Sequence, residues 1–359
     1  MAYQLNLSAR YQDILKATIK HYIATAEPVG SKTLAQEYNL KVSSATIRNA
    51  MGKLEDAGLL YQPHISAGRI PSDSGYRIYV DRLLVRDNNI NKIIEQSLQQ
   101  ELQLERASLE ALLQRATRIL AALSGYVALI TFPQNVNNIL QHLQLVQVSP
   151  RQIMLIVVTD SYQTQSILID SPFAAEENSK NEELNRDELQ ILSNFLNYEL
   201  KGKSLTEIAS LDWQEIDREF ERYTDFLKIL STTLQHSFQP NNFTPIVIHG
   251  VAEVLRQPEF THLQQVQALL YLLEEGQEQL FPVIFPLSNT PDSSHKVTIK
   301  IGSENQLEPM RTCTLVSANY YQDETPVGSV GIIGPTRMLY ENAIALVETT
   351  ADYLSDAFK

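Results

Sequence analysis

The chain has 359 residues, of which 43% are hydrophobic and 20% charged, and its formal net charge is −13. This length exceeds what one ordinary core organises, so two or three domains are expected. A single cysteine excludes an internal disulfide, and no apolar run is long enough to cross a bilayer. Since Met1–Asp13 lacks an apolar leader, we expect a cytoplasmic protein without membrane contact.

The charge is unevenly distributed along the chain. Residues 1–86 contain 11 Lys/Arg against 7 Asp/Glu, a net charge of +4. The remaining 273 residues contain 18 Lys/Arg against 35 Asp/Glu, a net charge of −17. A basic module on an acidic body attracts phosphates to one surface and repels them elsewhere, which is typical of a DNA-binding regulator.

Three helices and a hairpin are predicted in this basic module, which we place at residues 1–86. Apolar residues at helical spacing indicate a helix over Ser8–Thr25 and a short one over Ser31–Tyr38. A third helix begins at Ser43 or Ser44 and ends at Ala57, followed by a glycine suited to a helix C-terminus. Two short strands at 59–63 and 69–71 then enclose a small polar tip, and a further helix covers 73–85.

Beyond residue 86 the pattern alternates between helix and strand. A long connecting helix is expected over 91–123, with later helices at 187–200, 213–238, 262–275 and 338–358. Strands are expected at 126–132, 143–148, 152–159, 164–169, 297–301, 312–318 and 329–333. Strands, then helices, then strands predict a multidomain α+β chain whose α/β domain contains a mainly helical insertion. We place the α/β domain at 87–170 and 280–359, and the insertion at 171–279.

The third helix and the hairpin carry the residue types that read DNA. An α-helix fits the major groove, where Arg pairs with guanine and Asn with adenine, while Lys and hydroxyl groups contact phosphate. Any one of these side chains could be an ordinary solvated residue, but the order of helix, turn, capped helix and basic hairpin favours DNA binding. The candidate DNA-binding residues are Lys32, Ser44, Thr46, Arg48, Asn49, Lys53, His64, Ser66, Arg69 and Arg77.

No catalytic or metal-binding constellation is recognisable. The seven histidines are never within four residues of one another, and no serine stands in a nucleophile elbow. Gly30-Ser31-Lys32-Thr33 is similar to the end of a phosphate-binding loop but lacks the upstream glycine. We therefore expect no enzyme activity, no metal and no cofactor.

Several motifs resemble those of the HrcA family of heat-inducible transcription repressors. In the basic module they are Glu27–Lys32, Ser44–Asn49, Gln62–Pro71 and Gly75–Arg77. The resemblance continues to the C-terminus through Gln257–Phe260, Ile301–Asn305 and Gly331–Met338 followed by Tyr340. Ser44, Ala50 and Ser72 depart from the residues common in the family, and none of these departures removes a group that DNA binding needs.

The resemblance implies a particular architecture and role. It implies an N-terminal winged helix-turn-helix, a GAF-like domain and an inserted dimerising domain. It further implies repression of chaperone operons through double-stranded DNA with an inverted repeat called CIRCE, bound as a homodimer. Dependence of the active state on the GroE chaperonin, and loss of repression on heating, are implied in the same way. GAF-like domains often bind small ligands, so the alternative is a metabolite-responsive regulator with a polar pocket in that domain.

A seam of apolar residues offers a dimer interface. Its members recur at alternating intervals of three and four residues along one predicted helix face. They are Trp213, Ile216, Phe220, Tyr223, Leu227, Leu230 and Leu234. The alternative is that this seam packs within its own domain, against Leu189, Leu192 and Leu196.

Overall fold

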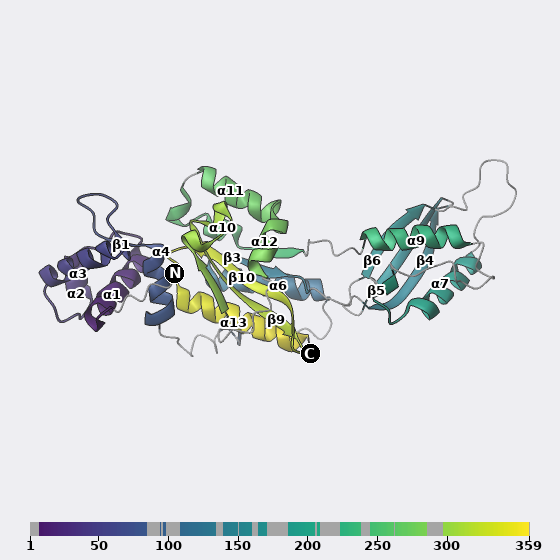
Figure 1. Ribbon diagram of the computed structural model, residues 1–359, viewed down its shortest axis with the longest axis horizontal. Coiled ribbons are helices and arrows are strands. Elements are labelled where there is room, and N and C mark those ends of the chain that lie inside the picture. The colour runs from purple at the N-terminus through teal and green to yellow at the C-terminus, as the bar shows by residue number, and fades with distance from the viewer. Residues whose placement is uncertain are drawn as a thin grey trace. The chain divides into compact units, whose positions relative to one another are not determined.

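The computed structural model describes residues 7–84, 94, 96–97, 108–133, 139–149, 151–159, 164–170, 186–204, 207–208, 223–237, 245–261, 263–285 and 297–358. The chain divides into two compact units (Figure 1). The first comprises Met1–Phe132 and Pro245–Lys359, and the second comprises Pro133–Thr244. Mixed helix and sheet confirm the predicted α+β class.

The first unit begins with the N-terminal module, residues 7–84. Its elements are α1 (Ala9–Thr25), α2 (Ser31–Glu37), α3 (Ser44–Asp56), β1 (Leu60–Tyr61), β2 (Ile70–Pro71), α4 (Asp73–Ile78) and the π-helical turn η1 (Tyr79–Leu83). These match the predicted order, and β1 pairs antiparallel with β2. Buried side chains that recur at helical spacing, such as Ile47, Met51 and Leu54 on α3, form its core.

Local chemistry sets the ends of α3. The Ser43 hydroxyl accepts a hydrogen bond from the backbone N–H of Thr46, so Ser43 rather than Ser44 is the N-cap. At the other end, Gly58 has φ +72°, a left-handed conformation that favours glycine. These two signals confirm the predicted limits of the helix.

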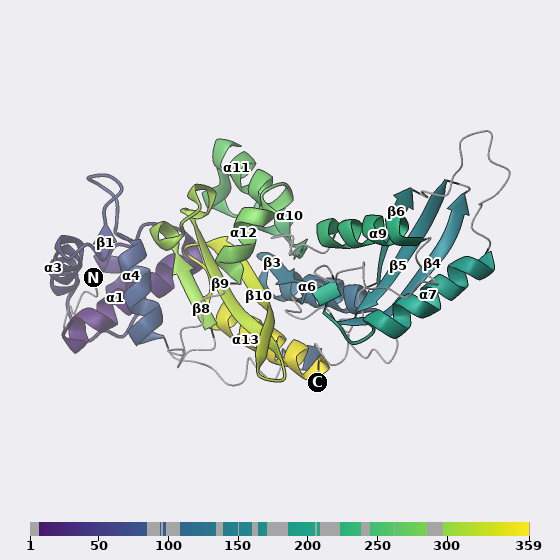
Figure 2. The same cartoon turned by 45° about the vertical axis from the view of Figure 1, so that its right-hand side comes forward.

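The rest of the first unit is the sheet module. Five antiparallel strands have the order β7-β3-β10-β9-β8. They are β3 (Val127–Thr131), β7 (Ile246–His249), β8 (Val297–Ile301), β9 (Cys313–Gln322) and β10 (Thr325–Pro335). Helices α6 (Leu109–Ser124) and α13 (Tyr340–Ala357) cover one face, and α10 (Val251–Val254), α11 (Leu263–Glu274) and α12 (Gln277–Ile284) lie over the other (Figure 2). Within the predicted connecting helix, the structure describes α6 and, before it, residues 94 and 96–97, which are also helical.

The second unit, which we call the inserted unit, is a three-stranded sheet covered by helices on one face. Antiparallel strands β4 (Leu140–Ser149), β5 (Gln152–Thr159) and β6 (Thr164–Asp170) have the order β4-β5-β6. Helices α7 (Arg186–Leu200) and α9 (Thr224–Ser237) pack on one face through a shared apolar core. The side chain of Asn197 on α7 bonds the backbone N–H and C=O of Leu143, which ties helix to strand.

The domain limits differ from those expected at two places. Strands β4–β6, which we expected in the α/β domain, belong to the inserted unit. Strand β7 and helix α11, which lie within residues 171–279 of the expected insertion, instead join and cover the five-stranded sheet. The physical reason is that an apolar run predicts a strand without saying which sheet it joins. The burial pattern distinguishes them: β3 is buried throughout because both faces are covered, whereas β5 alternates.

Candidate nucleic-acid interface

Helix α3 presents a polar face above a buried apolar stripe. Arg48, Asn49 and Lys53 are exposed, as predicted, while Ile47 and Leu54 are buried beneath them. Ser44 and Thr46 are half-buried at the first turn of the helix. The free backbone N–H groups of that turn also favour an anion. One helix face therefore offers groups for base edges and for phosphates.

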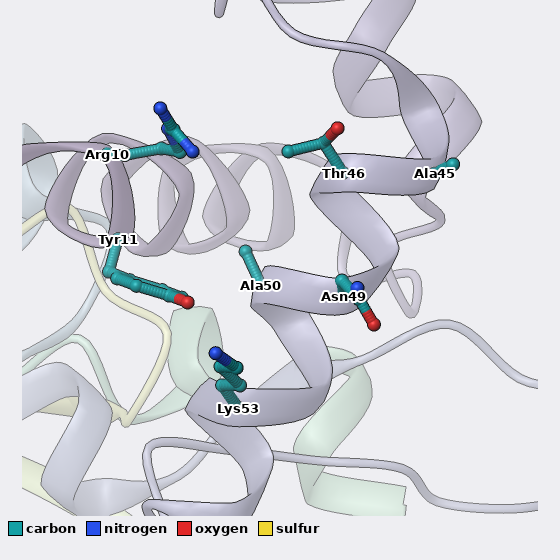
Figure 3. Close-up of a pocket in the computed structure, with 7 residues that line it drawn as sticks. All are labelled: Arg10, Tyr11, Ala45, Thr46, Asn49, Ala50 and Lys53. Carbon is teal, nitrogen blue, oxygen red and sulfur yellow. The ribbon is translucent and has the colours of Figure 1, made fainter.

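A groove runs between α3 and the start of α1 (Figure 3). It has a volume of about 320 Å³ and is lined by Arg10, Tyr11, Ala45, Thr46, Asn49, Ala50 and Lys53. Figure 3 shows Arg10 and Tyr11 on α1 opposite Asn49, Ala50 and Lys53 on α3. The lining includes two cations and no carboxylate, which suits a polyanionic backbone.

Arg10 and Tyr11 were not among the predicted site residues. The apolar stripe of α1 explains how this helix packs, but it carries no information about the role of its first turn. The available signal is a cation and an aromatic residue at the second and third positions after the N-cap residue Ser8. Only the packing of α1 beside α3 places them next to the polar face of α3.

The loop between β1 and β2 is braced from within. The side-chain amide of Gln62 donates to the carbonyl oxygens of Ile65 (2.9 Å) and Ala67 (2.8 Å). His64 and Ser66 are exposed at the tip, and their side chains lie 3.3 Å apart between Nδ1 and Oγ. The loop tip therefore presents these two predicted contact residues on an ordered backbone.

The base of this loop is attached to the segment that precedes α2. Val29 and Arg69 exchange two backbone hydrogen bonds of 2.9 Å each. A Cβ atom at Gly68 would lie 2.4 Å from the carbonyl oxygen of Val29, so this position requires glycine. Lys32 is exposed one turn further along, on α2.

Two predicted phosphate contacts have partners inside the protein. Arg69 forms an ion pair with Glu55 of α3 (Nε–Oε2 2.7 Å), and its side chain is only 22% exposed. Arg77 donates to the carbonyl oxygen of Ile299 and pairs with Glu304 and Asp81. The hydrogen bond to Glu304 raises the pKa of the Arg77 guanidinium. Arg77 therefore faces the sheet module and not the candidate interface on α3. The sequence pattern could not predict this, because its partner Glu304 lies 227 residues away.

The predicted dimer seam is buried where the structure describes it. Tyr223, Leu227 and Leu230 lie in the core of the inserted unit together with Leu192 and Leu196. These three are therefore not available to a second chain, and the alternative of packing within the domain accounts for them. Trp213, Ile216 and Phe220, and the side chain of Leu234, lie outside the described residues.

The described residues form neither a metal site nor a membrane span. No three His, Cys, Asp or Glu side chains there come together as metal ligands would, and no helix in this part of the chain is long and apolar enough to cross a membrane. Cys313 is buried, and burial raises the pKa of its thiol to about 11. That value leaves little thiolate for nucleophilic chemistry at neutral pH.

Comparison with known proteins gives consistent matches. The family model described as HrcA protein C terminal domain matches residues 110–344. A protein named heat-inducible transcription repressor HrcA from Cyanothece sp. is 55% identical over 361 residues, covering 98% of each chain. Its namesake from Trichormus variabilis is 56% identical over 363 residues, covering 99% of this chain and 100% of its own.

One solved structure shares the fold over nearly the whole length. It is a crystal structure of a hypothetical protein, with a TM-score of 0.61 and 23% sequence identity. The superposition covers 98% of this chain and 99% of the other.

Proposed function

The chain belongs to the HrcA family, and from this premise we propose that it is a heat-inducible transcription repressor that binds double-stranded DNA through a winged helix-turn-helix in residues 1–86. The observation that supports this most strongly is the exposed face of α3, where Arg48, Asn49 and Lys53 stand over a fully buried stripe. A helix of this kind can enter the major groove without losing its own packing.

Each group in the interface has a distinct role in this proposal. Arg48 would pair with the O6 and N7 atoms of guanine, and Asn49 with N6 and N7 of adenine. Lys53 and Arg10, from the two walls of the groove, would contact phosphates and set the register of the helix. His64 and Ser66 would meet the backbone or the minor groove beside it, and Lys32, Ser44 and Thr46 would contact further phosphates.

The charge distribution supports one productive orientation. The net charge of +4 in residues 1–86 attracts the duplex, and the net charge of −17 in the rest of the chain repels it. Non-specific phosphate contacts by the sheet module or the inserted unit are therefore disfavoured.

We further propose that the repressor is a homodimer on an inverted repeat of the CIRCE type, since a two-fold operator requires a two-fold reader. The interface we propose is the face of the β4-β5-β6 sheet opposite α7 and α9. Val146, Met154 and Leu168 form one apolar row across its three strands, with Val146 38% and Leu168 55% exposed. A second copy of the same face would cover this row, which itself contains no charged residue.

Chaperone control is the part of the proposal that depends on family membership alone. GroE chaperonin would maintain the DNA-binding form, and heat would release repression when chaperonin is occupied by other clients. The alternative, a metabolite sensor, requires a polar pocket in the GAF-like domain. In the sheet module, however, the side chains on both faces of the strands are apolar and buried in packed cores, among them Leu129, Ile130 and Ile332. This packing favours the repressor over the metabolite sensor.

A footprint of the purified protein on its own chaperone promoters tests the proposal. We expect protection of an inverted repeat, and loss of that protection when Arg48 and Asn49 are both changed to Ala. The same footprint after heating, with and without GroE, tests the chaperone dependence separately. Uniform protection along the promoter, unchanged by the double substitution, would reject sequence-specific binding.

A further inference from the structure

The N-terminal module is attached to the sheet module by two separate sets of contacts within the first unit. The first set involves α4 and η1. The Asp73 carboxylate accepts a hydrogen bond from the backbone N–H of Ser303 (2.8 Å), and Arg77 donates to the carbonyl oxygen of Ile299 (2.7 Å). Arg77 also pairs with Glu304, and the Tyr79 hydroxyl donates to Glu341 (2.8 Å). These contacts lie at the C-terminal end of the N-terminal module.

The second set involves the last turn of α1. Arg337 donates to the carbonyl oxygen of Ile23 (3.1 Å) and to the side-chain oxygen of Gln257 (3.0 Å), and it pairs with Glu259. Its side chain is 13% exposed, so this ion pair is shielded from solvent. Removing either partner would leave the other charge buried and unpaired, so Glu259 keeps Arg337 in the position from which it donates to Ile23.

Gly302 allows the first set to form. Its φ is +52°, and a Cβ atom there would lie 2.3 Å from the carboxylate of Asp73. The carboxylate of Glu304 accepts the backbone N–H of Ile301 as well as pairing with Arg77. Burial would raise the pKa of Glu304, but these hydrogen bonds outweigh it and lower the pKa. Glu304 therefore stays ionised at neutral pH and keeps its bond to Arg77.

The two sets together restrict how the reading helix can move. A single attachment would leave the N-terminal module free to pivot, whereas attachments through α4 and through α1 oppose rotation about either one. Ile301–Asn305, Gln257–Phe260 and Arg337 were conspicuous in the sequence, and none of them lies in the candidate interface on α3. Ser303, Glu304 and Arg337 contact the N-terminal module directly, and Gln257 and Glu259 hold Arg337 in place, which gives these residues a role.

We infer that Asp73, Arg77, Gly302, Glu304 and Arg337 are positioning residues that fix the orientation of α3 on the sheet module, and so contribute to the half-site spacing that a dimer recognises. This inference rests on the proposed function, since it presupposes a dimer on an inverted repeat. Two reading heads bind together only when their separation matches the operator, and the gain from simultaneous binding is lost when the geometry is not maintained.

The test compares wild type with Arg77→Ala and Gly302→Ala on duplexes derived from the footprinted promoter segment. One duplex contains a single half-site, and a series contains both half-sites moved apart or together by single base pairs. Arg256→Ala is the matched control, because it removes an arginine from an exposed ion pair of the same unit, where the side chain is 74% exposed.

For wild type and the control we expect one preferred spacing. For Arg77→Ala and Gly302→Ala we expect an unchanged affinity for the single half-site, and an affinity for the preferred spacing that falls by about tenfold with the spacing preference flattened. An unchanged salt dependence on the half-site separates this role from a lost phosphate contact.

Glu304→Gln is the second variant, because glutamine retains an oxygen for the Ile301 N–H while losing the charge that Arg77 meets. Melting by circular dichroism reports whether each variant is folded. Folded variants that keep the wild-type spacing preference, or that lose half-site and full-site affinity equally, would overturn the inference. Wild type that binds neither duplex above a scrambled one would instead refute the proposed function, and the inference with it.

Discussion

Arg48 and Asn49 are adjacent on α3, and both side chains are exposed while Ile47 beside them is fully buried. Substituting either one by Ala should lower the discrimination between operator and random DNA by about 1–3 kcal/mol, because each loses a bidentate contact with a base. The melting temperature should change little, since no core contact is removed. Competition binding against random duplex measures the effect.

Asn194→Ala is the matched control for Asn49→Ala. Asn194 is an exposed amide on α7 of the inserted unit, where it accepts a hydrogen bond from Gln190. Its loss should leave discrimination unchanged. A folded Arg48 or Asn49 variant with the discrimination of wild type would remove that residue from the set of base contacts.

Arg10 and Arg69 make opposite predictions for salt dependence. Arg10 is exposed in the groove beside α3, so Arg10→Ala should reduce the slope of log affinity against log salt by about 1. Arg69 is neutralised by Glu55, so Arg69→Ala should weaken binding by loosening the loop and leaving a carboxylate unpaired, without the same change in slope. Equal reductions in slope would show that Arg69 also meets phosphate.

For single residues, helical periodicity predicts which side chains face away from the core, and it correctly identifies Arg48, Asn49 and Lys53 as exposed. It does not predict partners that are distant in sequence. Glu55 pairs with Arg69 and Glu304 pairs with Arg77, two cations that the sequence pattern assigns to DNA contacts. Arg10 becomes part of the site only through the packing of α1 on α3.

Among the elements, α4 depends on one hydroxyl group. Ser72 Oγ accepts the backbone N–H of Gly75 (3.1 Å) and donates to the carbonyl oxygen of Gly58 (2.6 Å). Ser72→Ala should lower the free energy of unfolding of the N-terminal module by about 1 kcal/mol, through loss of the helix cap. Hydrogen exchange of the α4 amides measures the local effect.

Ser74→Ala is the control within the same helix. Ser74 is exposed, and its substitution also deletes a serine Oγ but leaves the bond between Ser72 Oγ and the Gly75 N–H in place. Comparable loss of protection in both variants would show that the hydroxyl of Ser72 contributes no more than an ordinary surface serine.

Helices and strands were predicted with good limits wherever a cap or a glycine marks them, as Ser43, Ser72 and Gly58 do. Their assignment to domains was less successful. The sequence pattern assigns β4–β6, and the range that contains β7 and α11, to the wrong domain, because strand and helix patterns are local while sheet membership is decided by long-range pairing. The alternation in β5 was the available signal, since it marks a sheet with only one covered face.

At the level of the whole molecule, the dimer interface that we propose lies on a different surface of the inserted unit from the apolar seam predicted from the sequence. Leu227 and Leu230 are fully buried in its core, whereas Leu168 is 55% exposed on the open face of the sheet. Leu168→Glu should yield a folded monomer, because a carboxylate would be buried without a partner in the interface. Sedimentation velocity measures the change in mass.

Ile191→Glu is the matched control, since Ile191 is 58% exposed on α7, the helix side of the same unit. It should remain a dimer. Leu227→Glu should instead unfold the inserted unit, because the charge would enter its core. A dimeric Leu168→Glu protein would exclude the open sheet face as the interface.

The central claim is that this chain reads DNA sequence through α3. It is tested most directly by titrating the wild-type protein, at one fixed salt concentration, with the footprinted inverted repeat and with a duplex of identical length and composition in scrambled order. We predict an affinity ratio of about 10³ or more in favour of the inverted repeat. Equal affinities for the two duplexes would contradict the claim.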